Sequence, residues 1–109
     1  MHELSIAESV VDTVLERTGD QRVTTVRLQV GRLSGVVPDA LMFCFELATA
    51  GTPLEGAELR IDAPTGGAHC RGCGRDFDVD DLVLLCPCGS ADVEVVAGRE
   101  LQILSVEVV

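Results

Sequence analysis

The sequence predicts an α+β fold in which two helices and a small mixed sheet of about three strands carry an inserted zinc-ribbon-like module. Two segments repeat apolar residues at helical spacing, and three others carry the apolar pattern of strands. Four of the five cysteines fall between the second and third of these strands, in a stretch rich in glycine. A chain of 109 residues has room for one small domain, or for one core with a minor module.

The first helix is expected from Glu3 to Arg17, ending before Gly19. Its apolar residues recur three and four positions apart, at Leu4, Ala7, Val10, Val11, Val14 and Leu15. A strand is expected from Val23 to Val30, where apolar and polar side chains alternate. Residues 31–35, which begin and end with glycine, are expected to form a loop.

The second helix is expected to begin near Pro38, because a proline in the first helical turn loses no hydrogen bond. The helix continues from Ala40 to Ala50 and ends at Gly51. Its apolar residues are Leu41, Phe43, Cys44, Phe45, Leu47 and Ala48. We interpret Cys44, which stands among them, as a small buried apolar residue without a chemical role.

Two further strands are expected in the second half of the chain. One spans Ala57 to Ala63, where apolar residues alternate with charged ones. The other spans Glu100 to Val109, and its apolar set changes phase between Ile103 and Leu104. That change predicts a bulge, or burial on both faces of the strand.

The segment 64–97, between these two strands, has a different character, with five glycines and four of the five cysteines. It cannot build much core of its own, so we expect a bound metal to hold it together. The sequence therefore predicts an α+β domain made of residues 1–63 and 98–109, and a metal-binding domain made of residues 64–97.

The cysteines form two short turns. Cys70 and Cys73 make a C-x-x-C turn, and Cys86 and Cys88 make a C-Pro-C turn. Two such turns supply four thiolates, the ligand set of a closed structural zinc site, which leaves no open position for catalysis. The second turn has one intervening residue where two are usual. His69, instead of Cys88, is therefore an alternative fourth ligand.

The N-terminal residues offer a second candidate metal site. Met1 and His2 bring a terminal amine, a backbone amide and an imidazole into one short stretch. With deprotonated amides, such a stretch gives the square-planar, nitrogen-rich geometry that suits Ni(II) or Cu(II). Spacing alone leaves ordinary alternatives open, with His2 as a solvated terminal residue and Glu3 as a carboxylate favoured by the helix dipole.

Composition counts against several classes of function. Eighteen acidic and eight basic residues give a net charge of -10, which repels nucleic acid and anionic lipid. The absence of a secretory signal pattern and of a membrane-length apolar run predicts a cytoplasmic protein that uses its cysteines for metal.

Two alternative functions remain open. One is a zinc-ribbon adaptor or nucleic-acid-binding module, and the other is a thiol oxidoreductase that uses Cys70 and Cys73.

Several short motifs, taken together, cover nearly the whole chain. They are Met-His-Glu-Leu-Ser at residues 1–5, Val-Gly-Arg-Leu-Ser-Gly-Val at 30–36, Phe43-x-Phe45-Glu46, Gly51-Thr52, Cys-Pro-Cys-Gly-Ser at 86–90, and Glu100-Leu101 with Ser105-Val106-Glu107. In this combination the sequence resembles the HypA/HybF family of hydrogenase maturation proteins. The family usually has Cys-Pro-x-Cys in the second turn, and this chain lacks that x.

The resemblance implies a nickel metallochaperone rather than an enzyme. Such a protein works with a HypB-type GTPase to load nickel into the large subunit of nickel-iron hydrogenase, and some members also serve urease maturation. The resemblance implies nickel at His2 and the Met1 nitrogen, supported by Glu3, in the α+β domain. The implied zinc ligands are Cys70, Cys73, Cys86 and Cys88. No nucleic acid or membrane partner is expected, and a homo-oligomer stays open.

Overall fold

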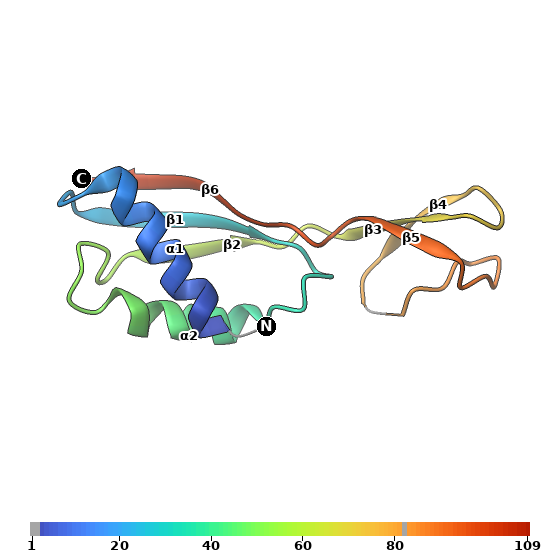
Figure 1. The fold of residues 1–109 in the computed structure, drawn as a ribbon, viewed down its shortest axis with the longest axis horizontal. Helices are drawn as coiled ribbons and strands as arrows, with labels where there is room; N and C mark the ends of the chain where they lie inside the picture. The colour runs from blue at the N-terminus through green and yellow to red at the C-terminus, as the bar shows by residue number, and fades with distance from the viewer. Residues whose placement is uncertain (1–2, 82) are drawn as a thin grey trace.

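The computed structural model describes residues 3–81 and 83–109. The described chain is elongated, 53 × 20 × 17 Å, with two helices and one sheet at one end and a second sheet at the other (Figure 1). Its elements are α1 (Glu3–Thr18), β1 (Val23–Val30), α2 (Pro38–Thr49), β2 (Glu58–Asp62), β3 (Gly66–Cys70), β4 (Asp76–Val79), β5 (Val93–Ala97) and β6 (Leu101–Val108). No described helix is both long and apolar enough to span a membrane. These elements confirm the predicted α+β class.

The first sheet has the strand order β2-β1-β6. β1 pairs in parallel with β2 and antiparallel with β6, so the sheet is mixed, as predicted. Arg27 lies opposite Ser105 and the next residue, Leu28, lies opposite Ile103. Leu104 is therefore the extra residue of a bulge, at the position where the apolar pattern changes phase.

Helices α1 and α2 both lie on the same side of the first sheet and bury their apolar faces there (Figure 1). On α2 the buried residues Leu41, Phe45 and Thr49 follow one another every four positions. Phe43 and Leu47 belong to another face of α2 and are 61% and 57% exposed. In the sequence analysis, Phe43 and Leu47 were placed among the apolar residues of this helix, but only one face of α2 packs against the core.

The second sheet lies within residues 64–97 and has the strand order β4-β3-β5, with both pairs antiparallel. Its buried apolar cluster consists of Leu33, Ala68 and Val79. Leu33 comes from the loop after β1, so the cluster borrows part of its small core from outside the insertion. The sequence predicts the poor core of this segment but not its three strands.

Three glycines meet where the two sheets join. The Gly31 N–H donates a hydrogen bond to the Glu100 carbonyl. A Cβ at Gly31 would collide with the carbonyl of Gly98, and a Cβ at Gly66 would lie 2.6 Å from the Val79 carbonyl oxygen. The backbones approach so closely that side chains have no room there, and we call these three glycines the glycine junction.

Candidate metal centres

The first cysteine turn sits at the end of β3, in the hairpin that leads to β4. Cys70 is the last residue of β3, and its backbone N–H donates to the Arg75 carbonyl across the hairpin, at 2.8 Å. The Cys73 N–H points back at Cys70 Sγ, at 3.4 Å. Gly74 follows with φ of 76°, a left-handed conformation that glycine adopts without steric cost. The turn thus aims both sulfurs to one side.

The second turn repeats this pattern outside any strand. The Cys88 N–H points at Cys86 Sγ, at 3.5 Å, and the Gly89 N–H donates to the Cys86 carbonyl, at 2.8 Å. The Cys86 N–H donates to the Ser90 carbonyl at 2.9 Å and closes the loop. Although one residue shorter than usual, the turn brings Cys88 to the same side as Cys86.

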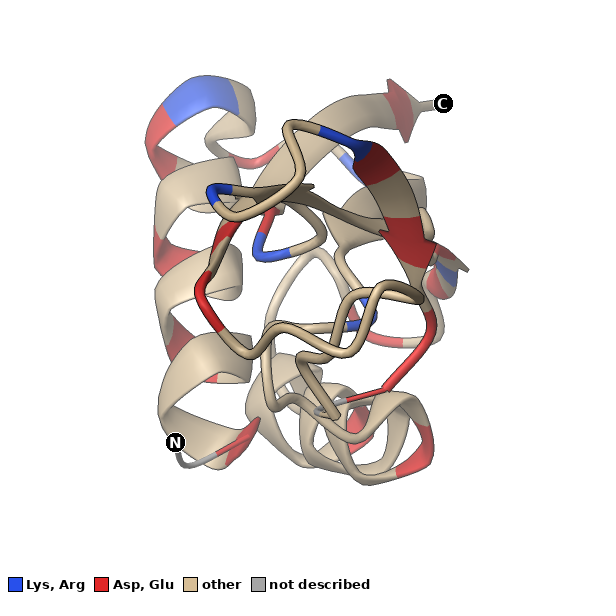
Figure 2. Ribbon diagram, turned by 90° about the vertical axis from the view of Figure 1, so that its right-hand side faces the viewer, with Lys and Arg blue, Asp and Glu red and all other residues tan. Residues whose placement is uncertain are grey.

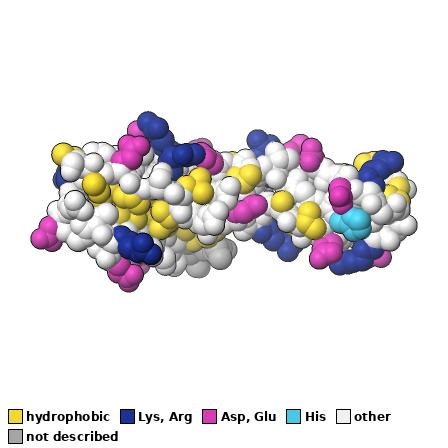
Figure 3. Space-filling model, turned by 90° about the horizontal axis from the view of Figure 1, so that it is seen from above, with side chains coloured by type: hydrophobic (Ala, Val, Ile, Leu, Met, Phe, Trp, Pro, Cys, Tyr) yellow, Lys and Arg dark blue, Asp and Glu magenta, His cyan; other side chains and the backbone are white. Residues whose placement is uncertain are grey.

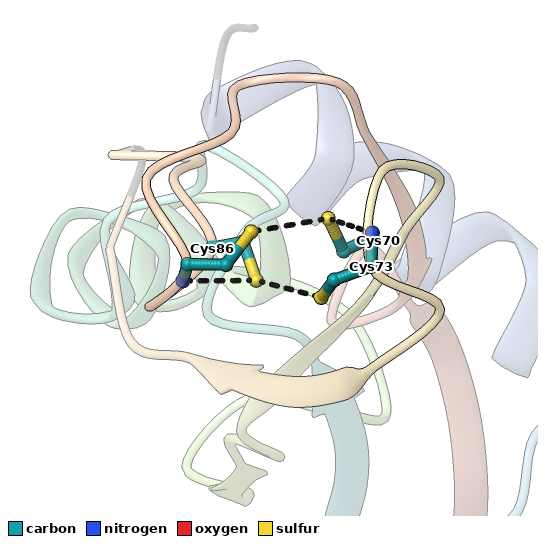
Figure 4. Close-up of side chains that lie close together, drawn as sticks. Cys70, Cys73 and Cys86 are labelled. Atoms are coloured by element: carbon teal, nitrogen blue, oxygen red, sulfur yellow. Dashed lines mark hydrogen bonds between the residues drawn. The ribbon is translucent and has the colours of Figure 1, made fainter.

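The four sulfurs form one compact cluster. Cys70 Sγ lies 3.8 Å from Cys88 Sγ, Cys73 Sγ lies 3.6 Å from Cys86 Sγ, and all four sulfurs lie within 4.8 Å of one another (Figure 4). A tetrahedral zinc site with Zn–S bonds of about 2.3 Å has sulfurs about 3.8 Å apart. A disulfide needs about 2.05 Å, so these sulfurs are spaced for a shared metal.

The protonation of the sulfurs also favours a cation in the cluster. The Cys73 backbone N–H lowers the pKa of Cys70 to about 6, against the opposing effect of burial. For Cys86 the Cys88 N–H acts in the same direction, but burial and the thiols of Cys88, Cys73 and Cys70 outweigh it and raise the pKa to about 12. A cation among the four sulfurs would lower the pKa of Cys86 by compensating the charge of its thiolate.

The arrangement fits a structural zinc ion. Four thiolates complete a tetrahedron and leave no position for a substrate or a water molecule. Cys70 and Cys86 are buried, while Cys73 and Cys88 are exposed, so each turn contributes one inner and one outer sulfur. Zinc held there would cross-link two loops that have few apolar contacts of their own.

His69 and Cys44, which the sequence analysis also considered, lie outside this cluster. His69 Nδ1 lies 2.6 Å from Asp76 Oδ1, across the β3–β4 pair, and the sulfur of Cys88 completes the four-ligand group. Cys44 lies half-buried on α2, where it packs against the main core. Neither residue joins the four sulfurs.

The predicted nickel ligands Met1 and His2 lie outside the described residues. Glu3, the predicted supporting residue, is the first residue of α1, and its Oε2 accepts a hydrogen bond from the Val37 N–H at 3.3 Å. Val37 is the N-cap of α2, so Glu3 links the starts of the two helices. Sequence reasoning missed this contact, because no local pattern relates residues that are 34 positions apart.

The comparison with known families decides the classification. A family described as HypA, hydrogenase/urease nickel incorporation metallochaperone, matches residues 1–108. The chain belongs to the HypA family. This membership confirms the resemblance drawn from the short motifs, and with it the coarse function of a nickel metallochaperone in hydrogenase maturation.

Individual HypA proteins agree with this result. The hydrogenase maturation factor HypA of Streptomyces avermitilis is 53% identical over 112 residues, which cover 97% of this chain and 86% of that protein. That of Geobacter metallireducens is 47% identical over 109 residues, 99% of each chain. The solution structure of the Ni metallochaperone HypA from Helicobacter pylori matches with a TM-score of 0.66 at 22% identity, over 99% of this chain and 97% of that one, and supports the fold.

Proposed function

We propose that this HypA protein binds Ni(II) through the Met1 amine, neighbouring backbone amides and the His2 imidazole, and delivers the ion during hydrogenase maturation. The observation that carries the proposal is the family match over residues 1–108, which includes the Met-His-Glu start. Nickel is the cargo of the protein, whereas zinc in the cysteine cluster is a permanent cross-link. Chemical catalysis has no part in this function.

The ligand set of the proposed nickel site suits reversible binding. An amine, amides and an imidazole close fused chelate rings in one plane, a geometry that Ni(II) accepts well and Zn(II) gains less from. Glu3 supports the site, because its hydrogen bond to Val37 ties the beginning of α1 to α2. Protons compete with the metal for the His2 imidazole, so acidification weakens binding and favours release.

We assign the two metals to two domains. Residues 1–63 and 98–109 form the nickel-binding domain, which contains the larger apolar core. Residues 64–97 form the zinc-binding domain, which contains the cysteine cluster and the second sheet. The main buried cluster lies wholly in the first part, and among the described residues the cluster of the second sheet takes only Leu33 from that part, which supports this division.

The proposed partners are a HypB-type GTPase and the large subunit of nickel-iron hydrogenase, in the cytoplasm, where reduced thiols stay available for zinc. The net charge of -10 favours partners with basic surfaces. Nickel-loaded chain, mixed with the GTPase and the nickel-free large subunit, should transfer its nickel. Transfer no faster than from free Ni(II) would contradict delivery.

Calorimetric titration with nickel tests the site itself. A chain that starts at Met1 should bind one equivalent of Ni(II). Both His2→Ala and a Gly-Ser extension ahead of Met1 should lose this binding, because one removes the imidazole and the other blocks the amine. Glu8→Ala removes an exposed carboxylate from α1 and serves as the matched control, which should bind like the parent. Unchanged stoichiometry and affinity in His2→Ala would overturn the proposal.

A further inference from the structure

Strand β6 is an edge strand whose protection against pairing is limited to the bulge at Leu104 and one charged residue. It lies at one end of the order β2-β1-β6, and no other described strand pairs with its outer edge. It spans eight residues without proline or lysine, and Glu107 is its only charged residue. The opposite edge strand, β2, spans five residues, of which Glu58, Arg60 and Asp62 are charged. Short, charged edges resist strand addition, whereas long, apolar ones permit it.

A groove runs along the side of this strand, between β6 and α1. Its larger part has a volume of about 600 Å³ and is lined by Ser5, Ser9 and Thr13 of α1 and by Leu101, Gln102 and Ile103 of β6, among others. A second part of about 420 Å³ continues along the same two elements to Arg17 and Val106. Seen from the side of β6, hydrophobic side chains gather in a band over this half of the molecule (Figure 3).

The length of the groove suits an extended peptide. From Ser5 to Thr18, both of which line it, α1 rises about 20 Å at about 1.5 Å per residue. Six residues of a strand span about the same distance, at about 3.3 Å each. An added strand beside β6 could therefore use the whole groove, with every second side chain directed into it.

The outer lip of the groove is acidic. Glu8, Asp12 and Glu16 are exposed and recur every four residues, so they form one stripe along α1. This stripe lies beside that of Ser5, Ser9 and Thr13, because each of its residues is three positions after one of them. Acidic residues appear on successive turns of α1 (Figure 2). Arg17 lines the far end of the groove and is the one basic side chain among its described lining residues.

We propose that β6 and this groove form a docking site for an extended, basic segment of a partner protein. The segment adds a strand to the outer edge of β6, and every second side chain of the segment faces the groove. Among these side chains the apolar ones fill the groove, and Lys or Arg side chains between them extend to the acidic stripe. A second copy of this chain is a poor occupant, because it brings the same acidic stripe and a net charge of -10. The proposal does not depend on where nickel binds.

The direct probe is a lysine-valine peptide of ten residues, blocked at both ends. Lysine and valine take turns at its odd positions, so that both face the groove, and threonine fills its even positions. Titration of the zinc-loaded chain, followed by amide chemical shifts, should move the signals of residues 101–108 and leave those of residues 58–62 in place. A glutamate-valine peptide of the same length should bind at least tenfold more weakly. A lysine-valine peptide with alternate N-methylated amides should also lose at least tenfold, because it cannot complete the strand pairing.

Variants of the lip provide the second arm. Asp12→Lys combined with Glu16→Lys should weaken binding of the lysine-valine peptide at least tenfold. Glu46→Lys combined with Asp39→Lys, at exposed positions of α2, makes the same change of net charge and should leave binding within twofold. Three results would each overturn the proposal. The lysine and glutamate peptides could bind equally well, both double variants could lose the same affinity for the peptide, or the chemical-shift changes could be confined to residues 58–62. Shifts of residues 101–108 on self-association, without peptide binding, would also overturn it.

Discussion

Cys88 completes the sulfur cluster although its turn is one residue shorter than that of Cys73. Its sulfur lies 3.8 Å from Cys70 Sγ, close to the separation that tetrahedral zinc requires. His69, the alternative raised by the sequence, is instead close to Asp76. The N–H contact from Cys88 to Cys86 Sγ shows how the short turn still orients its second sulfur toward the cluster.

Substitution of Cys88 tests this assignment. Cys88→Ser should lower zinc affinity on the order of 100-fold or more, because even residues that only support metal ligands are worth 10–100-fold. His69→Ala should change zinc affinity less than about threefold, since its ring lies outside the ligand group. Competition with a chromophoric chelator measures both. A large loss in His69→Ala with none in Cys88→Ser would show that the imidazole is the fourth ligand.

Two phenylalanines on α2 differ sharply in burial and provide a matched pair. Phe45 is 2% exposed and Phe43 is 61% exposed. Phe45→Ala should lower the free energy of unfolding by about 3–5 kcal/mol, because it leaves a cavity in the main core. Phe43→Ala should change it by less than about 0.5 kcal/mol. Urea denaturation measures the two variants, and equal effects would contradict the observed orientation of α2.

Among the elements, the glycine junction determines how the chain passes from β2 of the first sheet to β3 of the second. A Cβ at Gly66 would lie 2.6 Å from the Val79 carbonyl oxygen, which is backbone and cannot rotate away. At the next residue, Gly67, a Cβ would meet its nearest neighbour, the Ala97 side chain, at 3.6 Å. These two adjacent positions of β3 therefore test the junction with the same chemical change.

Gly66→Ala should lower the free energy of unfolding by about 1–3 kcal/mol, the usual cost of an overpacked site. Gly67→Ala should be neutral, or stabilise the protein by up to about 1 kcal/mol, because alanine restricts the unfolded chain. Thermal unfolding of the zinc-loaded proteins gives both values. If the two variants unfold alike, close backbone packing at Gly66 is not what shapes the junction.

How far the sequence predicts an element depends on the length of its pattern. α1, β1 and β2 carry clear apolar repeats and appear within one or two residues of their predicted bounds. The change of apolar phase at Leu104 predicted either a bulge or burial on both faces of the strand, and the register of β6 against β1 shows the bulge. β3, β4 and β5 span only four or five residues among glycines and acidic residues, too few to show a period.

The parts of the candidate site were also predictable only where their pattern is local in sequence. The cysteine spacing predicted a cluster that fits zinc, because both turns are local in sequence, but it left His69 open in place of Cys88. The Glu3–Val37 hydrogen bond and the groove between α1 and β6 arise from segments far apart in the chain, which no local pattern relates. The exposure of Phe43 was missed because helical spacing does not fix how wide the buried face of a helix is.

In the whole molecule, we expect zinc to stabilise one end and apolar packing the other. Among the described residues only Leu33, Ala68 and Val79 form the buried apolar cluster of the second sheet, whereas the first sheet and its helices share a much larger one. Removal of zinc by a chelator should therefore unfold β3, β4 and β5, so that their amide signals collapse into the narrow chemical-shift range of an unfolded segment. Signals of β1 should persist. Loss of both sets together would contradict the division into two domains.

We propose that nickel and zinc occupy different sites in this chain, with nickel at the N-terminus. The test is X-ray absorption at the nickel edge, on the zinc-loaded chain with one equivalent of nickel and no residue ahead of Met1. We expect nitrogen and oxygen neighbours in a planar arrangement, with an imidazole signal that His2→Ala abolishes. Sulfur neighbours around nickel, or an imidazole signal that survives in His2→Ala, would contradict it.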